Sequence, residues 1–244
     1  MSDLYVGIAR TLNALGVKLE EKEVADVAKQ CKADGSALIL TDRLLSMALD
    51  RKMERTVATL RKFSRIPVHK RLDTFDFSFQ PSIDEKQIRR LATLGFIHAG
   101  GNVILIGDPG CGKSHIAISL AEECLDHGMR AYYITMSDLA LKLTDAKKEN
   151  RLKRVMSSLM RPDCLVLDEV GYDHLDLDAS ELVFKLISAR YERKSIIVTS
   201  NYPISRWTEV FGSDALTQVI ADRLVHHAEV IRITGKSYRL KGRI

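Results

Sequence analysis

The sequence predicts a three-layer α/β domain built on a parallel sheet and preceded by a small all-helical region. From about residue 84, short apolar runs alternate with helical patterns, whereas the first 80 residues show helical patterns alone. The apolar runs are continuous, as is typical of parallel strands that are buried on both faces. Six of the 14 glycines lie between Gly95 and Gly112, and a glycine-rich phosphate-binding motif begins within that stretch.

Three helices are expected in the N-terminal region. Apolar residues recur at helical spacing over 4–15 and stop at a glycine, a residue favoured just after a helix. A second helix is expected where apolar residues repeat this spacing over 24–31, with the glutamates at 20, 21 and 23 early in the helix, where its dipole favours acids. The third and longest is expected to run from residue 41 or 42 to Phe63, because the residue before Pro67 disfavours the helical backbone.

The remaining elements belong to the α/β part. Five strands are expected, over 103–106, 131–135, 164–167, 195–200 and 229–233. Helices are expected between them, over 116–125, 138–143, 152–160 and 182–191. The aromatic-rich segment 67–81 is expected to be an irregular connector that docks on this domain. We therefore predict a helical N-terminal domain over 1–66, which binds DNA or a partner, and an α/β domain over 67–244 that includes the connector.

Composition and spacing exclude several classes of protein. The chain of 244 residues is 45% hydrophobic and 28% charged, yet no stretch approaches the roughly 18 apolar residues of a membrane span. The N-terminus lacks a secretory signal and the four cysteines show no paired spacing, so we expect a cytoplasmic protein with free thiols. The seven histidines show no metal-ligand spacing. His226 and His227 are adjacent, so a helix would point them in different directions.

The strongest chemical signal is the segment GDPGCGKS at 107–114, a full match to the pattern GxxxxGK[ST]. It follows a predicted strand and opens a predicted helix, so successive backbone N–H groups face one phosphate at the helix N-terminus. Lys113 is expected to reach the β- and γ-phosphates of ATP, and the Ser114 hydroxyl to bind Mg²⁺. A glycine-rich turn that binds nothing is the alternative. The predicted nucleotide-binding residues are Gly107, Asp108, Pro109, Gly110, Cys111, Gly112, Lys113, Ser114 and His115.

Two more predicted strands end in polar residues, Asp168-Glu169 and Asn201. Ligands gather at the carboxyl ends of strands in α/β sheets, so these side chains are expected to face the phosphate loop. We expect Asp168 to hold the Mg²⁺ through its water shell and Glu169 to orient and activate the attacking water. Asn201 is expected to hydrogen-bond that water or the γ-phosphate. The alternatives are a solvated acidic strand end and an ordinary turn residue.

The order of these three elements is that of AAA+ ATPases, and the surrounding residues resemble a narrower family, IstB. The resemblance rests on LDTFDFSFQP at 72–81, DEVGY at 168–172, TSNYP at 199–203, WTEVFG at 207–212, ADRLVH at 221–226 and GKSYRL at 235–240. It covers nearly the whole chain, most firmly from residue 66 onward. IstB is the ATP-binding transposition helper of bacterial insertion sequences and a close relative of the helicase loader DnaC.

The resemblance implies a P-loop NTPase fold of the AAA+ type and further site residues. Arg223 matches the arginine finger that these ATPases insert into the ATP site of a neighbouring subunit, which implies an ATP-dependent homo-oligomer with ATP at its subunit interfaces. An arginine on a helix surface is the alternative. Arg239 is expected to contact phosphate or DNA. Because the chain ends soon after the last predicted strand, we expect no helical lid domain.

Positive charge is concentrated in two stretches of the chain. The stretch 43–71 holds nine Lys/Arg against two acids, a net +7, whereas the whole chain carries +5. The tail over 230–244 adds five Lys/Arg without an acid, two of which are Lys241 and Arg243. Spacing on one helical face suits contacts with the phosphates of duplex DNA, with a solvated basic helix as the alternative. The predicted DNA-binding residues are Arg43, Arg51, Lys52, Arg55, Lys62 and Arg65.

Residues and resemblance together predict a Mg²⁺-dependent ATPase of the bacterial cytoplasm, associated with the nucleoid and not with a membrane. It is expected to oligomerise on duplex DNA, to remodel or mark the target, and to recruit a cognate transposase. Two alternatives remain open. One is a DnaC-like loader of a replicative helicase, and the other is a DNA scaffold that binds ATP without hydrolysing it.

Overall fold

The computed structural model of the chain describes residues 2–240. Lys241 and Arg243 of the basic tail therefore lie outside the described residues. Contacts between residues divide the chain into two units, one up to Thr59 and one from Leu60 onward, so the division falls within helix α3 (Gly35–Phe63). The assignment of two domains with a boundary after residue 66 stays a prediction.

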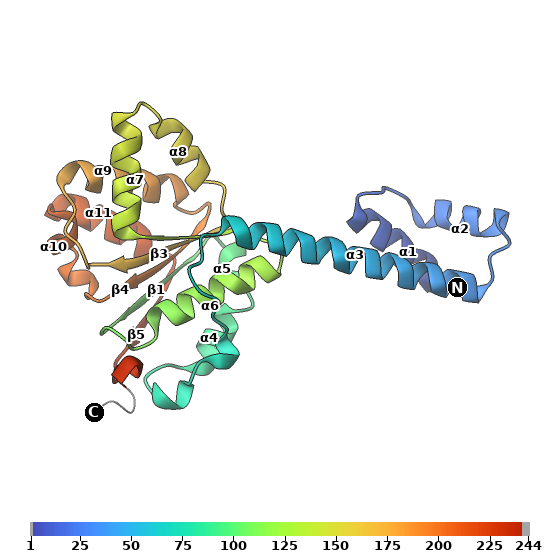
Figure 1. The fold of residues 1–244 in the computed structure, drawn as a ribbon, viewed down its shortest axis with the longest axis horizontal. Coiled ribbons are helices and arrows are strands. Elements are labelled where there is room, and N and C mark those ends of the chain that lie inside the picture. The colour runs from blue at the N-terminus through green and yellow to red at the C-terminus, as the bar shows by residue number, and fades with distance from the viewer. Residues whose placement is uncertain (1, 241–244) are drawn as a thin grey trace. The chain divides into compact units, whose positions relative to one another are not determined.

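The first unit is a small helical cluster made of α1 (Ser2–Leu15), α2 (Glu21–Gln30) and most of α3 (Figure 1). Its core holds five buried side chains: Ile8, Ala9, Val24, Ala28 and Leu38. The predicted start of α3 is wrong by six residues or more. The Asp34 carboxylate accepts a hydrogen bond from the backbone N–H of Ala37 at 2.8 Å, so the cap lies earlier and the helix begins at Gly35.

Lys52 of α3 is held by a contact inside this first unit. Its Nζ donates hydrogen bonds to the carbonyl oxygens of Ala14 at 2.9 Å and Leu15 at 3.0 Å. These are among the carbonyls that the end of a helix leaves without an intrahelical partner. Lys52 therefore satisfies the C-terminus of α1, a contact that the sequence pattern did not predict.

The second unit is built on five parallel strands in the order β2-β3-β4-β1-β5. The predicted α/β fold is confirmed, and each predicted strand is present with ends that differ by at most three residues. The strands are β1 (Asn102–Gly107), β2 (Ala131–Thr135), β3 (Cys164–Val170), β4 (Ser195–Ser200) and β5 (Ala228–Ile233). Residues of β1, β3 and β4 are almost entirely buried, which explains their continuous apolar sequence.

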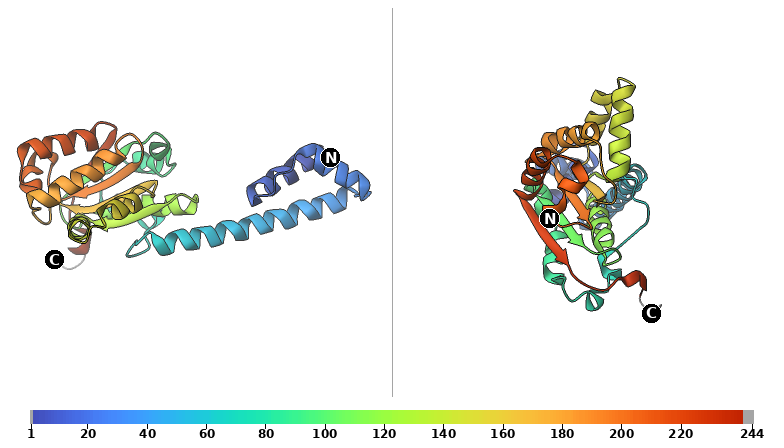
Figure 2. Two further views of the ribbon diagram at one scale, coloured as in Figure 1. Left: turned by 90° about the horizontal axis from the view of Figure 1, so that it is seen from above. Right: turned by 90° about the vertical axis from the view of Figure 1, so that its left-hand side faces the viewer.

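Helices cover both faces of this sheet, so the predicted three layers are present (Figure 2). Alternate residues of β1 divide between the two faces: Ile104 belongs to one core and Val103 to the other. The first face is covered by α7 (Met136–Lys148), α8 (Leu152–Leu159), α9 (Leu177–Arg190), α10 (Thr208–Phe211) and α11 (Asp214–Val225). The second is covered by α4 (Glu85–Leu91), α5 (Gly95–His98) and α6 (Lys113–Asp126). None of the described helices is both long and apolar enough to cross a membrane.

The connector after α3 packs on the second unit, as predicted. It contains two short 3-10 turns, η1 (Leu72–Thr74) and η2 (Phe77–Phe79), and two more such turns, η3 (Ile204–Arg206) and η4 (Tyr238–Leu240), occur later in the chain. Leu72 is buried in the same core as α6, with Phe75 packed against it. The aromatic residues of the connector thus attach it beside the helix that follows the phosphate loop.

Arg190, the last residue of α9, is a fully buried cation. Its guanidinium donates hydrogen bonds to the carbonyl oxygens of Leu159 at 2.8 Å, Pro162 at 3.1 Å and Ser195 at 2.8 Å. Removal from water lowers the pKa of Arg190 to about 10. One side chain thereby connects the end of α8 and the chain before β3 to the start of β4.

Candidate nucleotide-binding site

The carboxyl ends of β1, β3 and β4 lie at one edge of the parallel sheet and border a cavity of about 590 Å³. That volume is in the range of sites for nucleotide-sized ligands. Most of the residues predicted to share this site line the cavity, whereas Gly107, Asp108 and Asp168 do not. Among the lining residues are Pro109, Gly110, Cys111, Gly112, Lys113, Ser114, His115, Glu169, Asn201 and Arg239.

The loop after β1 turns sharply into α6 at Gly112. Gly112 has φ of +105° and stands at the N-cap of α6. A Cβ at this position would lie 2.6 Å from Cε2 of Phe75 in the connector. Glycine is therefore required both by the backbone conformation and by the close approach of the aromatic ring.

Lys113, the first residue of α6, is buried beneath this loop. Its Nζ donates hydrogen bonds to the loop's own carbonyl oxygens, at 2.7 Å to Gly107 and 2.9 Å to Asp108. Burial lowers the pKa of Lys113, while the nearby acidic groups, Asp168 among them, act in the opposite direction. A phosphate group would supply the ammonium with a compensating negative charge.

Asp168 is the buried carboxylate of the site, with 2% of its surface exposed. Oδ1 accepts a hydrogen bond from Ser114 Oγ at 2.9 Å and a short one from Thr199 Oγ1, and Oδ2 accepts a short one from the Tyr133 hydroxyl. Burial and this bond to Asp168 raise the pKa of Tyr133, so the phenol stays a donor. Three hydroxyl donors thus orient one carboxylate.

Tyr133 and Thr199 were not among the predicted site residues. Thr199 is the last residue but one of β4, and Tyr133 is the third of the five residues of β2; both strands pair with β3. The signal available in the sequence was a hydroxyl side chain within each of these strands. These hydroxyl groups can be assigned to the site only when the strand order is known, because β2 and β4 are the two neighbours of β3.

Glu169 differs sharply from Asp168, although the two are adjacent. Its side chain is exposed and lines the cavity, and its backbone has φ of +62°. The pairing between β3 and β4 shifts register between Leu167 and Val170, and the Glu169 N–H donates to Thr199 Oγ1 at 3.0 Å. This bulge directs Glu169 away from the core and toward the cavity, a strained arrangement typical of functional residues.

The connector and the C-terminal segment complete the cavity wall. Tyr238 N–H donates to the Gly110 carbonyl at 2.9 Å, and Gln80 Nε2 donates to the Lys236 carbonyl at 2.8 Å. Arg239 lies in this segment and faces the cavity.

The His115 ring stands edge-on to Phe75 at 5.2 Å, and burial lowers the pKa of His115. The lowered pKa favours a neutral imidazole beside the phosphate loop.

Arg223 is not brought into this cavity. It lies on α11, where its guanidinium stands 4.7 Å from the centre of the Phe184 ring and donates to the Ser188 hydroxyl, both on α9. Its side chain is partly exposed. A role for Arg223 at this chain's own cavity is therefore unsupported, and its predicted role concerns a second copy.

The six predicted DNA-binding residues are exposed, and they lie on α3 or just after it. Lys52 also makes the contacts with α1 described above. Two other cations of the same basic stretch are paired with acids of α6: Arg61 with Glu122 at 2.7 Å and Asp126 at 3.0 Å, and Arg71 also with Asp126. Because these two cations are already paired with acids, fewer positive charges of this stretch are available to a ligand than the nine Lys/Arg in its sequence.

Gly112→Ala is expected to weaken ATP binding by about 10-fold or more. An alanine at this φ is strained by roughly 1–3 kcal/mol, and its Cβ would displace Phe75 from the loop. Titration with a fluorescent ATP analogue measures the change. Gly35→Ala is the matched control, because a Cβ there meets nothing within 4 Å. Equal affinities in both variants would contradict the assignment of the loop.

Comparisons with known proteins place these features in a family. Residues 12–244 match the family model described as IstB-like ATP binding protein. The protein named for ATP binding in insertion sequence IS21 of Pseudomonas aeruginosa is 43% identical over 201 residues, 81% of this chain and 76% of that protein. Its counterpart in insertion sequence IS232 of Bacillus thuringiensis subsp. berliner is 33% identical over 242 residues, 99% of this chain and 97% of that protein. The crystal structure of the DnaC helicase loader is 26% identical with a TM-score of 0.53, covering 67% of this chain and 96% of that chain.

Proposed function

The chain belongs to the IstB-like ATP-binding proteins of insertion sequences and has the AAA+ fold, and on that premise we propose that it is an ATP-hydrolysing, DNA-binding helper of transposition. The observation that carries the proposal is the contrast between adjacent carboxylates. Asp168 is buried and held by three hydroxyl donors, whereas Glu169 is exposed and lines the cavity of the phosphate loop. A protein that only binds ATP would have no use for an exposed carboxylate on a strained backbone at that position.

Each polar side chain of the cavity has a distinct task in this proposal. The loop N–H groups and the N-terminus of α6 bind the phosphates, and Lys113 exchanges the loop carbonyls for the β- and γ-phosphate oxygens. Glu169 accepts a hydrogen bond from the attacking water and orients it toward the γ-phosphate. Asn201 donates its amide N–H to the same water or to a γ-phosphate oxygen. Arg239 supplies positive charge at the phosphate end of the cavity.

The donor set at Asp168 and Ser114 fits a magnesium ion. Both groups offer oxygen atoms, which Mg²⁺ prefers, and Ser114 Oγ is 2.9 Å from Asp168 Oδ1. We infer that the Ser114 hydroxyl binds the ion and that Asp168 accepts hydrogen bonds from its water ligands. When bound, Mg²⁺ neutralises phosphate charge that develops during hydrolysis. Tyr133 and Thr199 keep Asp168 oriented for that task.

Arg223 is proposed to act on the ATP of a neighbouring copy, which would make hydrolysis depend on oligomerisation. This rests on its match to the arginine finger, on its partly exposed position on α11, and on its absence from the lining of this chain's own cavity. Arg223→Ala and Lys113→Ala are each expected to lack activity, because each damages one half of a shared site. Mixing the two variants should restore part of the ATP hydrolysis, measured as phosphate release. Mixtures that stay inactive at every ratio would overturn the shared site.

Duplex DNA is proposed to bind the exposed cations of α3 through its phosphates. Arg51→Ala combined with Arg55→Ala is expected to weaken binding and to reduce the slope of log affinity against log salt by about 2, since each lost phosphate contact removes roughly 0.9. Fluorescence anisotropy at several salt concentrations measures this slope. Lys22→Ala with Lys29→Ala on α2 removes the same charge from exposed positions of the same unit. An equal change in both double variants would contradict a specific role for α3.

A transposase is the partner proposed from the family, and a replicative helicase is the second candidate. The helicase is a candidate because the structural similarity to the DnaC helicase loader covers 96% of that chain. Affinity capture of purified cognate transposase and purified host helicase by the ATP-bound protein separates the two. Capture of the helicase alone would replace the proposed partner.

A further inference from the structure

Three side chains with metal-ligating atoms converge at the edge of the sheet opposite the cavity, where β4 and β5 begin. Glu192 follows α9, and His226 and His227 follow α11. Glu192 Oε1 lies 3.3 Å from His227 Nε2 and 3.8 Å from His226 Nδ1, and one ligand atom of each residue lies within 4.8 Å of the other two. Among residues 2–240 this is the one group of three or more such side chains that close together.

Adjacent histidines on a helix would point in different directions, but the centres of the His226 and His227 imidazole rings lie only 4.1 Å apart. The helix stops at Val225, His226 is its C-cap with backbone angles that are still helical, and His227 lies in the turn that leads into β5. In this arrangement, the imidazole rings of His226 and His227 both lie next to the Glu192 carboxylate.

The backbone that carries these side chains is closely packed. A Cβ on Gly100 would lie 3.2 Å from the Glu192 carbonyl oxygen, and a Cβ on Gly101 would lie 3.0 Å from the His227 carbonyl oxygen. The Asn102 N–H also donates to that His227 carbonyl at 2.9 Å. Both ligand-bearing turns are thus held against the two glycines that precede β1, so their separation is set by the fold.

The donor set matches one class of metal ion. Two imidazole nitrogens and one carboxylate oxygen, with a fourth position open to water, are typical of zinc and related divalent transition metals. Ligands at about 2.0–2.1 Å in tetrahedral geometry are about 3.4 Å apart, close to the observed 3.3 and 3.8 Å. The Tyr191 hydroxyl, 2.7 Å from His226 Nδ1, must move aside to free that nitrogen.

We propose that Glu192, His226 and His227 bind a divalent transition-metal ion of the zinc class and thereby tie the turn after α9 to the end of α11. The two helices joined in this way are those that hold Arg223, whose guanidinium contacts Phe184 and Ser188 of α9. The metal would restrain the end of α11 on which Arg223 lies. The binding itself does not depend on ATP hydrolysis, so it can fail or succeed independently of the proposed function.

Calorimetric titration of the full chain without a histidine tag, using Zn²⁺ alone, tests the proposal. One equivalent is expected to bind and to raise the melting temperature. His227→Ala and Glu192→Gln should each weaken binding by at least about 10-fold. His127→Ala is the matched control, because His127 is an exposed histidine at the end of α6 and outside the cluster; its affinity should equal that of the wild type.

Titration with Co²⁺ identifies the ligands independently of stability. Nitrogen and oxygen ligation is expected to give visible bands without the near-ultraviolet sulfur-to-metal band that thiolates produce. A strong thiolate band would point to a cysteine such as the exposed Cys31 and would overturn the proposal. Zn²⁺ binding that is as tight in His227→Ala and Glu192→Gln as in the wild type would overturn it as well.

Discussion

Glu169→Gln is expected to lower ATP hydrolysis by at least about 100-fold while ATP affinity stays within about twofold. A positioned carboxylate that acts as a general base contributes roughly 10²–10⁴-fold, and the amide cannot take up the proton of the attacking water. ATP binding depends on the loop and on Lys113, which the substitution does not touch. Glutamine has nearly the shape of glutamate and carries the same strain at φ of +62°, so the bulge in β3 is preserved.

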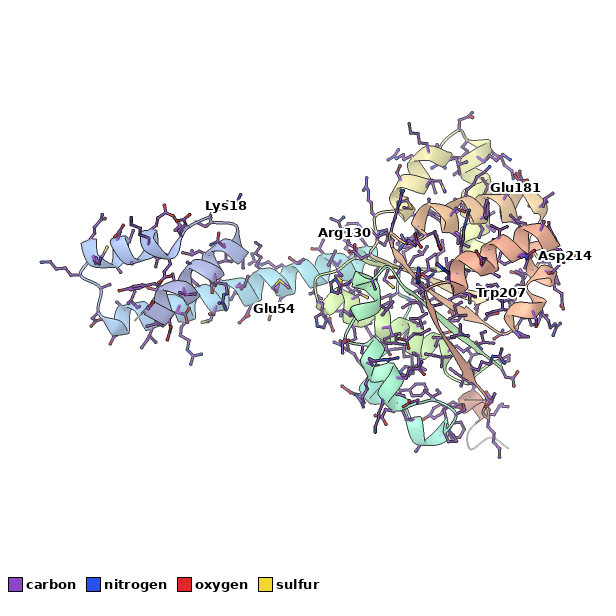
Figure 3. All side chains as sticks on the ribbon, turned by 180° about the vertical axis from the view of Figure 1, so that it is seen from behind. Lys18, Glu54, Arg130, Glu181, Trp207 and Asp214 are labelled. Atoms are coloured by element: carbon purple, nitrogen blue, oxygen red, sulfur yellow. The ribbon has the colours of Figure 1, made fainter. Side chains whose placement is uncertain are left out.

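Phosphate release at saturating ATP, with and without duplex DNA, measures the effect, and a fluorescent ATP analogue measures affinity. Glu181→Gln is the matched control, because Glu181 is exposed on α9 and does not line the cavity (Figure 3). Its turnover should equal that of the wild type. If Glu169→Gln turns over ATP at the wild-type rate, Glu169 is not the general base. If the wild-type protein itself releases no phosphate with or without DNA, it is better described as a DNA scaffold that uses ATP only to hold its structure.

Arg190→Ala is expected to lower the free energy of unfolding by about 3–5 kcal/mol. The substitution leaves three buried carbonyl acceptors without the donor they now share, and each unsatisfied group costs roughly 1–3 kcal/mol. It also opens a cavity where a fully buried side chain stood. Part of this loss in the free energy of unfolding is offset, because water can enter the cavity and because a positive charge is no longer buried.

Denaturant unfolding monitored by circular dichroism measures this change. Arg193→Ala is the matched control, since Arg193 is an exposed arginine three residues away, and its effect should stay within about 0.5 kcal/mol. Arg190→Met fills most of the volume but donates no hydrogen bond, so it should be less destabilising than Arg190→Ala and still clearly destabilising. Equal stability of Arg190→Ala and Arg193→Ala would show that the three carbonyls are satisfied by other donors.

The phosphate loop and the five strands could be predicted because their signals are local. Eight consecutive residues form the loop pattern, and each buried strand is one continuous apolar run. The predicted start of α3 is wrong for a local reason too, because the cap is Asp34 and the polar residues at 41 and 42 lie inside the helix. Contacts that join distant segments could not be predicted in this way.

The sequence by itself determined the fold class, the family and the phosphate-loop part of the cavity lining, because these follow from short contiguous patterns. The tertiary structure alone decided the hydroxyl partners of Asp168, the three carbonyls bound by Arg190, and the convergence of Glu192 with His226 and His227. Most of these contacts join residues about 30 positions apart, while Ser114 and Asp168 are 54 positions apart and Arg190 and Ser195 only 5. They meet only after the strands assemble in the order β2-β3-β4-β1-β5, and no local periodicity encodes that order.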